Sequence, residues 1–167
     1  MQYISFFESP VGRLYLTANE NALTGVAFEQ ENGNSFPIDL KNLEFSDTHP
    51  VLTDTKLWLS LYFNGNIPDF LPNISLAGTE FRQQVWEIVK KIPYGQTMSY
   101  GEIAQIVAKK RGTRPSAQAV GGAVGNNPIA IIIPCHRVLA ADKYIGGYSG
   151  GLENKRLLLD LEKVQYR

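Results

Sequence analysis

Residues 129–138 read Ile129-Ala130-Ile131-Ile132-Ile133-Pro134-Cys135-His136-Arg137-Val138, and Cys135 is the only cysteine of the chain. The apolar run predicts a buried strand that ends in a thiol and an imidazole. A free thiol has a pKa of about 8.5, so it needs a base or a positive charge nearby to be nucleophilic at neutral pH. A buried structural cysteine is the alternative, because free cysteine is among the most buried residue types.

The composition is that of an ordinary soluble globular protein. The chain has 167 residues, 44% hydrophobic and 19% charged, which is enough to bury a core and excludes disorder. No apolar stretch is long enough to span a membrane, and the N-terminus lacks the regions of a signal peptide. A lone reduced thiol fits the cytosol, so we expect a cytoplasmic protein. With only His49 and His136 as histidines, we expect no zinc site and no cofactor.

The net charge of zero conceals two halves of opposite sign. Residues 1–76 hold 3 Lys/Arg and 9 Asp/Glu, hence −6, whereas residues 77–167 hold 13 and 7, hence +6. This asymmetry predicts two domains, 1–76 and 77–167, the second facing a negatively charged partner.

The N-terminal part has the pattern of a small sheet with a helix. Alternation and turn signals predict an antiparallel meander of three strands over 3–8, 13–17 and 23–29. The segment 35–47 is expected to be a loop. A helix is predicted from about Pro50 to Asn64, with one face formed by Leu57, Trp58, Leu61 and Tyr62. No chemistry is visible here, which indicates a scaffold.

The second part is predicted to be mostly helical. Apolar spacing and capping signals predict helices over 81–89, 99–107, 117–124 and about 152–164. Ser99-Tyr100-Gly101-Glu102 has the spacing of a capping box. The connector between the second and third of these helices is basic, with Lys109, Lys110, Arg111 and Arg114. A helix, a basic turn and a helix resemble a DNA-binding helix-turn-helix, although a solvated basic loop is the plainer alternative.

The third of these helices, Ala117 to Val124, has almost no long side chains. Two consecutive glycines, Gly121 and Gly122, each cost about 1 kcal/mol relative to alanine. Close helix packing would explain them, and so would a helix that enters a nucleic-acid minor groove.

The C-terminal region holds a glycine-rich loop and a helix. Gly146–Gly151 lacks the Lys-Ser/Thr of a phosphate-binding P-loop, and its glycines around Tyr148 and Ser149 fit a backbone that wraps a flat ligand. In the last helix Leu157, Leu158, Leu161 and Val164 are predicted to face the core. Glu162 is by its position most simply a solvated helix carboxylate.

Several of these motifs together resemble the O6-alkylguanine-DNA alkyltransferases, also called methylated-DNA–protein-cysteine methyltransferases. The matching motifs are Phe-Arg-x-x-Val-Trp at 81–86, Pro-Tyr-Gly-Gln-Thr at 93–97, Val-Gly-Gly-Ala at 120–123, Asn127-Pro128, Ile-Pro-Cys-His-Arg-Val at 133–138 and Gly-Tyr-Ser-Gly-Gly at 147–151. The resemblance spans about residues 79–165. It implies an α+β protein with a small ribonuclease-H-like antiparallel sheet and helix, followed by a mostly helical, winged-helix-like domain with a helix-turn-helix.

The resemblance also implies a mechanism. Cys135 would accept the alkyl group, His136 would deprotonate it through a water, and Glu162 would orient the imidazole. Asn127 would brace the turn beneath the cysteine, and Tyr100 would help to rotate the target nucleotide. The pocket for the base would be lined by Pro134, Val138, Tyr148 and Ser149.

The implied partner is double-stranded DNA that carries O6-alkylguanine, bound by a monomer. DNA contacts would come from Arg82, Gly101, Thr113, Gln118, Ala119, Gly121 and Gly122, together with the basic residues Lys109, Lys110, Arg111 and Arg114. The chain departs from the family at Gln118, where an arginine often fills the gap left by the flipped base.

The expected function is therefore repair by irreversible transfer of the alkyl group to Cys135, once per molecule. The thioether product is outside the reversible chemistry of thiols, and no second cysteine exists to resolve it. Two alternatives remain open: a thiol hydrolase with a Cys-His-Glu triad, which would turn over repeatedly, and a non-catalytic lesion-binding protein.

Overall fold

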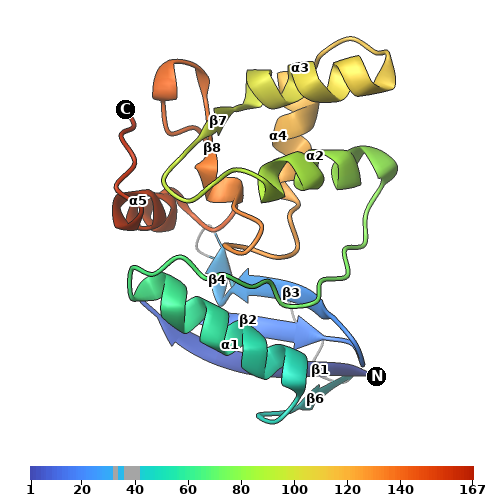
Figure 1. The fold of residues 1–167 in the computed structure, drawn as a ribbon, viewed down its shortest axis with the longest axis vertical. Helices are drawn as coiled ribbons and strands as arrows, with labels where there is room; N and C mark the ends of the chain where they lie inside the picture. Colours follow the sequence, from blue (N-terminus) through green and yellow to red (C-terminus); the bar gives the residue numbers. More distant parts are fainter. Residues whose placement is uncertain (32–33, 36–41) are drawn as a thin grey trace. The chain divides into compact units, whose positions relative to one another are not determined.

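The residues that the computed structural model describes are 1–31, 34–35 and 42–167. They form two compact units of an α+β protein, which confirms the predicted class. One unit is Met1–Leu76 with Pro128–Ala130, and the other is Ala77–Asn127 with Ile131–Arg167. Figure 1 shows the sheet in the first unit and most of the helices in the second.

The predicted meander is present in the first unit. It consists of β1 (Gln2–Ser9), β2 (Gly12–Ala18) and β3 (Leu23–Phe28), paired antiparallel in that order. The β1–β2 pairing runs to Ser9 opposite Gly12, so a two-residue turn joins the strands. Gly12 has a φ of +90°, which glycine adopts without the steric cost that other residues carry.

The sheet also has a strand that the sequence did not predict. The strand β6 (Leu43–Phe45) pairs parallel with β1, so the strand order is β3-β2-β1-β6 and the sheet is mixed rather than purely antiparallel. A short pair, β4 (Gln30–Glu31) and β5 (Asn34–Ser35), precedes it. The prediction of a loop over 35–47 is therefore wrong at β6, while its residues 36–41 lie outside the described part.

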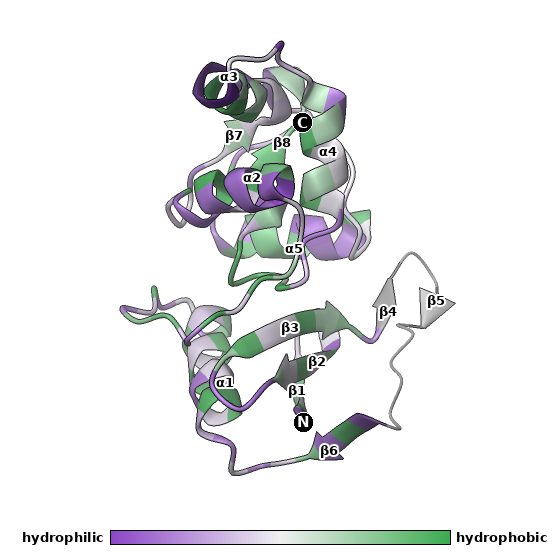
Figure 2. Ribbon diagram, turned by 90° about the vertical axis from the view of Figure 1, so that its right-hand side faces the viewer, coloured by the Kyte–Doolittle hydropathy of each residue, from purple (hydrophilic) through white to green (hydrophobic). Residues whose placement is uncertain are grey.

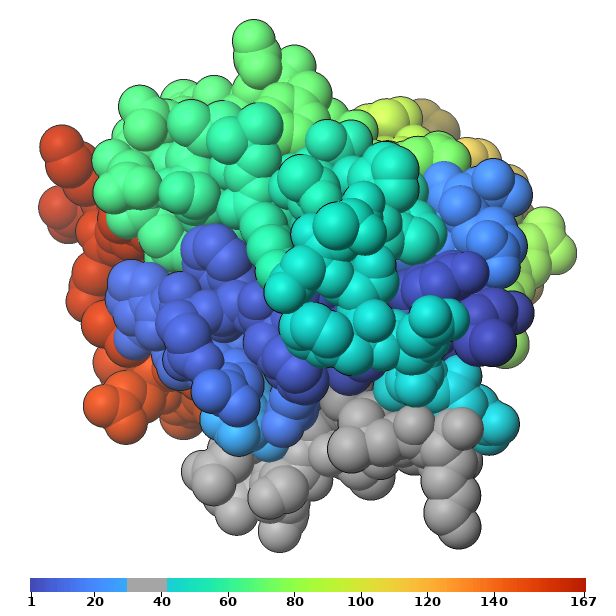
Figure 3. Space-filling view, turned by 90° about the horizontal axis from the view of Figure 1, so that it is seen from below, coloured from blue at the N-terminus to red at the C-terminus, as the bar shows by residue number. Residues whose placement is uncertain are grey.

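One helix covers the sheet of the first unit. α1 (Pro50–Phe63) begins at the N-cap His49, whose Nδ1 accepts the amide of Val51 at 3.2 Å. It contacts β1, β2 and β3, and its residues lie beside the N-terminal strands at the surface (Figure 3). Trp58 and Tyr62 are buried as predicted, whereas Leu57 is 53% exposed, so the predicted face was partly wrong.

The apolar run before the cysteine is not a strand. Only Ile129 makes a bridge, with Val26 of β3, and the residues after it form turns. Ile131 has a φ of +69°, a strained conformation for a β-branched residue. All of 129–133 is nevertheless buried, because burial and strand structure are separate properties of an apolar run.

The second unit contains four α-helices and one small sheet within its described residues. The helices are α2 (Glu80–Lys90), α3 (Tyr100–Arg111), α4 (Ala117–Gly125) and α5 (Leu152–Leu161). The sheet pairs β7 (Met98–Ser99) in parallel with β8 (Val138–Leu139). The side chains of Thr79, Ser99 and Ser116 cap α2, α3 and α4, so the predicted capping signal at Ser99 is confirmed.

Helices α2, α3 and α4 pack on one another around buried apolar side chains. The indole of Trp86 donates a hydrogen bond to the Ala123 carbonyl at 2.8 Å, which ties α2 to α4. Figure 2 shows hydrophilic residues (purple) on α2 and α3 and the paler, weakly apolar α4. No helix in the described ranges is both long and apolar enough to cross a membrane.

The last helix is shorter than predicted. α5 ends at Leu161 rather than near Val164, and Leu157 is 43% exposed, so its predicted core position is wrong. Leu158 and Leu159 are the leucines that face the core.

Candidate active site around Cys135

Cys135 lies in a buried turn rather than at a strand end. It opens the 3-10 helix η2 (Cys135–Arg137), with Pro134 as the preceding cap, and only 3% of the residue is exposed. The Asn127 amide donates to the Ile133 carbonyl at 2.9 Å, closing the chain segment that leads to the cysteine. The side chain of Asn127 thus links the end of α4 to the residues just before the cysteine.

Burial makes the thiolate of Cys135 costly. Burial raises the pKa of the thiol to about 12, and a hydrogen bond with Asn127 and the charge of Lys155 oppose only part of this effect. At neutral pH the resting cysteine is therefore a protonated thiol, and nucleophilic attack needs a base.

The imidazole next to the cysteine forms a buried pair with Glu162. His136 Nε2 lies 2.6 Å from Glu162 Oε2, and both side chains have no exposed surface. Burial lowers the pKa of His136, an effect larger than the opposing influence of Glu162, so the ring is neutral at pH 7. Since the carboxylate is ionised, the ring proton is assigned to Nε2 and Nδ1 carries the lone pair.

The carboxylate of Glu162 accepts hydrogen bonds from several groups near Cys135. Burial by itself would raise its pKa, but hydrogen bonds and charge from His136 and Arg137 lower it to about 2. Arg137 donates from Nε to Oε1 at 2.7 Å and from Nη2 to Oε2 at 3.2 Å. The Gly95 amide adds a bond to Oε1 at 2.9 Å. The interpretation of Glu162 as a solvated helix carboxylate is therefore wrong.

The end of α5 explains this placement. Glu162 is the C-cap of α5, and the next residue, Lys163, has a φ of +60°, so the chain reverses there. Glu162 follows the buried Leu159 and Leu158 by three and four residues, so it continues the inner face of the helix.

Two buried cations in this region were missed by the sequence reasoning. Arg137 also donates from Nη1 to the Ile92 carbonyl at 2.7 Å, and Lys155 is fully buried in α5. Lys155 lies three and four residues before the buried Leu158 and Leu159. Helical periodicity therefore places it on the inner face, which is the signal that could have revealed it.

Tyr100 lies beside the glycine-rich loop. Its hydroxyl donates to the Gly147 carbonyl at 3.3 Å, and a Cβ added to Gly146 would meet its ring at 3.3 Å. Burial raises the pKa of Tyr100, and charge on Cys135 raises it further. Tyr148 and Ser149 are half-buried in the same loop, and Val138 follows Cys135 in β8. Tyr100, Asn127, Cys135, His136 and Glu162 therefore belong to one region of the second unit.

The residues expected to bind DNA lie apart from this buried cluster. Most of them are exposed on α3, α4 and the connector, namely Gly101, Lys109, Lys110, Arg111, Thr113, Arg114, Gln118, Ala119 and Gly122. Gly121 and Arg82 are half-buried. A Cβ added at Gly122 would meet no atom within 4 Å, so this glycine borders open space rather than a close helix contact. Arg111 instead contacts α2, where it donates to Gln84 at 3.0 Å.

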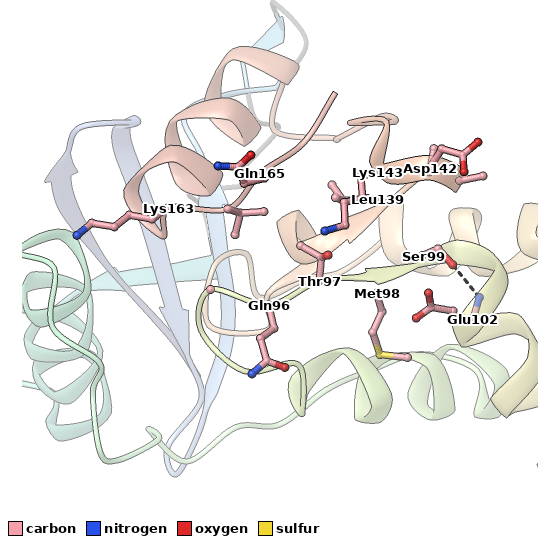
Figure 4. A pocket seen from close by; sticks show the side chains of 14 residues that line it. Gln96, Thr97, Met98, Ser99, Glu102, Leu139, Asp142, Lys143, Lys163 and Gln165 are labelled. Atoms are coloured by element: carbon pink, nitrogen blue, oxygen red, sulfur yellow. Dashed lines mark hydrogen bonds between the residues drawn. The ribbon is translucent and has the colours of Figure 1, made fainter.

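A pocket of about 720 Å³ lies elsewhere on the second unit (Figure 4). Its lining comprises 95–99, Glu102, 139–143 and 163–165. The hydrogen bond drawn there, from the Glu102 amide to Ser99 Oγ, is the cap of α3. None of the predicted catalytic residues lines it, so this pocket is not the cysteine site.

Family models match both parts of the chain. The DNA-binding domain of 6-O-methylguanine DNA methyltransferase matches residues 80–164, and the ribonuclease-like domain of the same proteins matches residues 2–76. A methylated-DNA–protein-cysteine methyltransferase of Haemophilus influenzae is 42% identical over 166 residues, covering 98% of this chain and 88% of that protein. The constitutive protein of that name from Bacillus subtilis is 34% identical, covering 100% and 99%.

Solved structures agree with this assignment. The crystal structure of Mycobacterium tuberculosis O6-methylguanine methyltransferase has a TM-score of 0.85 at 37% identity and covers 98% of this chain and 93% of that one. The structure of Mycobacterium tuberculosis OGT in complex with DNA has a TM-score of 0.82 at 38% identity, covering 96% and 92%. The chain belongs to the methylated-DNA–protein-cysteine methyltransferase family and is a methyltransferase of that class.

Proposed function

We propose that the protein extrudes O6-alkylguanine from duplex DNA and transfers the alkyl group to Cys135, one group per molecule. The observation that carries the proposal is the buried thiol beside an imidazole held by an ionised carboxylate. DNA as the partner is supported by the relative from Mycobacterium tuberculosis solved in complex with DNA.

The proposed reaction begins with the thiol. His136, oriented by Glu162, takes the proton of Cys135 through a water, with Nδ1 as the acceptor. The sulfur then attacks the alkyl carbon, a C–S bond forms, and the C–O6 bond breaks. Its electron pair stays on guanine, which takes a proton as it leaves. The imidazolium formed in the first step is stabilised by the ionised Glu162.

The base must leave the stack before this chemistry, at a cost of a few kcal/mol. In our proposal α4 enters the minor groove, where its exposed Ala119 and Gly122 permit close approach and Gln118 fills the vacated position. Lys109, Lys110 and Arg114 would neutralise phosphates, with further backbone contacts from Gly101 and Thr113.

The extruded base would lie against the glycine-rich loop. Tyr100, Val138, Tyr148 and Ser149 are proposed to line its pocket, with Pro134 beneath the cysteine. Tyr100 contacts this loop through Gly147, which supports the assignment.

The finer architecture is part of the same proposal. We infer a ribonuclease-H-like N-terminal domain over 1–76 and a winged-helix-like domain with a helix-turn-helix over 77–167. A monomer in the cytoplasm is the form that we expect to act.

Intact-mass measurement after incubation with a methylated duplex tests the proposal. We expect the mass to rise by one methyl group and product to reach a plateau at one equivalent, with no change in a folded Cys135→Ser variant. Product beyond one equivalent would favour the thiol hydrolase, and binding without any mass change would favour a non-catalytic lesion-binding protein.

A further inference from the structure

The pocket of about 720 Å³ on the second unit has walls that are joined to each other. One wall is the turn 139–143, and another is the segment 163–165. Main-chain hydrogen bonds connect the two segments just beyond the pocket. The Arg167 amide donates to the Lys143 carbonyl at 2.8 Å, and the Ile145 amide donates to the Arg167 carbonyl at 3.0 Å. The pocket is therefore preformed, as ligand sites usually are.

Backbone strain gathers at this pocket. Among the described residues, the non-glycine residues with positive φ are Ile131, Asp142, Lys143 and Lys163. All but the first of these line the pocket. Residues with a Cβ rarely adopt such φ values, because Cβ then approaches a carbonyl oxygen, and those that do so cluster at functional sites. The strain marks this pocket as a candidate ligand site.

Both lysines stand where the backbone favours glycine. Asp142 and Lys143 are the central residues of a tight turn, which the Tyr144 amide closes by donating to the Ala141 carbonyl at 3.2 Å. Their φ values are +56° and +62°, as in a type I′ turn, for which Asp-Gly is a preferred pair. Lys163 directly follows the C-cap of α5, a position that glycine most often occupies. A lysine in either place lowers stability and needs another explanation.

The side chains at the pocket suit an anion that accepts hydrogen bonds. Figure 4 shows the Lys143 side chain extending toward Thr97, whereas Asp142 points away from it. An ammonium and a hydroxyl both donate hydrogen bonds, and phosphate oxygens accept them. In the described part of the chain, Lys143 forms no ion pair with a carboxylate. Because Glu102 and Asp142 also line the pocket, a singly charged phosphodiester fits it better than a multiply charged free phosphate.

The pocket adjoins the surface that we propose to bind DNA. Ser99, which caps α3, and Glu102, in its first turn, line the pocket, and Gly101 between them is a proposed backbone contact. The basic connector lies at the other end of α3. A helix of 12 residues is about 18 Å long, which corresponds to about five base pairs of a duplex. One duplex can therefore reach both ends of α3.

We propose that this pocket binds a phosphodiester of the bound duplex, at the end of α3 away from the connector, with Lys143 and Thr97 as donors and Lys163 at the rim. This inference rests on DNA as the partner in the proposed function. The strained turn directs the Lys143 side chain into the pocket. The residue that lowers stability is thus the residue that raises affinity for DNA.

The test replaces Lys143 by glycine, which adopts positive φ freely, and by asparagine, which tolerates it and carries no charge. Lys91→Gln is the control, because it removes an exposed cation from the end of α2 in the same unit. Fluorescence anisotropy with an unmodified duplex of about 20 base pairs gives the affinity between about 50 and 200 mM salt. Thermal unfolding gives the stability of each variant.

We expect Lys143→Gly to raise the unfolding midpoint by about 2–4 °C and to weaken DNA binding. Loss of the fold cannot produce both effects together. The slope of log K against log salt should become shallower by about 0.9 in both Lys143 variants and stay unchanged in Lys91→Gln. Unchanged slopes in both Lys143 variants would overturn the proposal, as would an equal change in Lys91→Gln.

Two further outcomes separate this inference from its neighbours. Titration with inorganic phosphate, followed by NMR at the Thr97 and Lys143 amides, tests a free phosphate as the source. Shifts that Lys143→Gly abolishes, combined with unchanged DNA slopes, would assign the pocket to a free phosphate compound instead. Since the duplex carries no lesion, alkyl transfer does not enter. A complete lack of DNA binding would contradict the proposed function, whereas binding with unchanged slopes contradicts this inference alone.

Discussion

The Nε2 atom of His136 lies 2.6 Å from Oε2 of Glu162, and Arg137 donates hydrogen bonds to both oxygens of the same carboxylate. The orientation of the imidazole is therefore set by Glu162, and the position of Glu162 is in turn set by Arg137. Burial keeps the ring neutral in the resting protein, and the ionised carboxylate stabilises the ring once it accepts a proton.

Replacement of Glu162 by Gln should slow alkyl transfer by on the order of 100-fold, a typical contribution of general-base catalysis. The amide leaves the imidazolium without its anion and raises the apparent pKa of Cys135. Single-turnover transfer from a methylated duplex measures the rate, and Glu153→Gln on the exposed start of α5 is the control. Equal rates for both variants would leave Glu162 with a structural role only.

The acid stability of the fold should depend on the same carboxylate. The pKa of Glu162 is lowered from 4.5 to about 2 in the folded protein, so its contribution is present above pH 4.5 and is lost as the pH falls toward 2. This contribution is on the order of 3 kcal/mol. Urea unfolding between pH 2 and 7 should show a shallower acid loss in Glu162→Gln than in wild type. Parallel curves would contradict this prediction.

The basic residues around the α3–α4 connector should not contribute equally to DNA binding. Neutralising Lys109 and Lys110 should weaken binding to any duplex and reduce the salt slope by about one unit for each lost phosphate contact. Arg111→Met should reduce the slope less, because Arg111 is bonded to Gln84 and lies 5.6 Å from the Phe81 ring. Fluorescence anisotropy across a salt series measures the slopes. A larger loss with Arg111→Met than with Lys109→Met would show that Arg111 leaves α2 to bind DNA.

Gln118 is expected to act only when a base has to be extruded. Gln118→Ala should slow repair of a paired lesion about tenfold or more and affect transfer from free O6-alkylguanine much less. Transfer rates for the two substrates, determined in parallel, give the comparison. If both fell equally, Gln118 would support the fold or the pocket instead.

Local patterns predicted much of this structure. The alternation of apolar and polar residues correctly predicted the meander β1–β3. Capping residues correctly predicted where α3 and α4 begin. The strand β6 was missed because it pairs with β1, which lies about forty residues away in the chain. Its three residues are also too few to show the alternation of apolar and polar residues that indicates a strand. The apolar run 129–133 was assigned wrongly since a buried turn and a buried strand have the same composition.

The site was only partly visible in the sequence. The motif around Cys135 identified the thiol and the imidazole, but the position of Glu162 near the end of a helix suggested a solvated carboxylate, although it shares the inner face of α5 with Leu158 and Leu159. Arg137 and Lys155 were overlooked because charged residues are normally assigned to the surface. Both lie inside because polar groups from distant segments meet them there.

The pairing of Ile129 with β3 makes the first unit discontinuous in the chain. Val26 donates to the Pro128 carbonyl and accepts from the Ala130 amide, both at 3.0 Å. A fragment that ends at Leu76 would therefore lack the three residues that extend the edge of β3. Residues 128–130, which lie five to seven positions before the cysteine, thus belong structurally to the unit of the N-terminal sheet. Because both contacts are main-chain hydrogen bonds, a sheet exchanged from a relative would need a segment at 128–130 to pair with, but not these particular side chains.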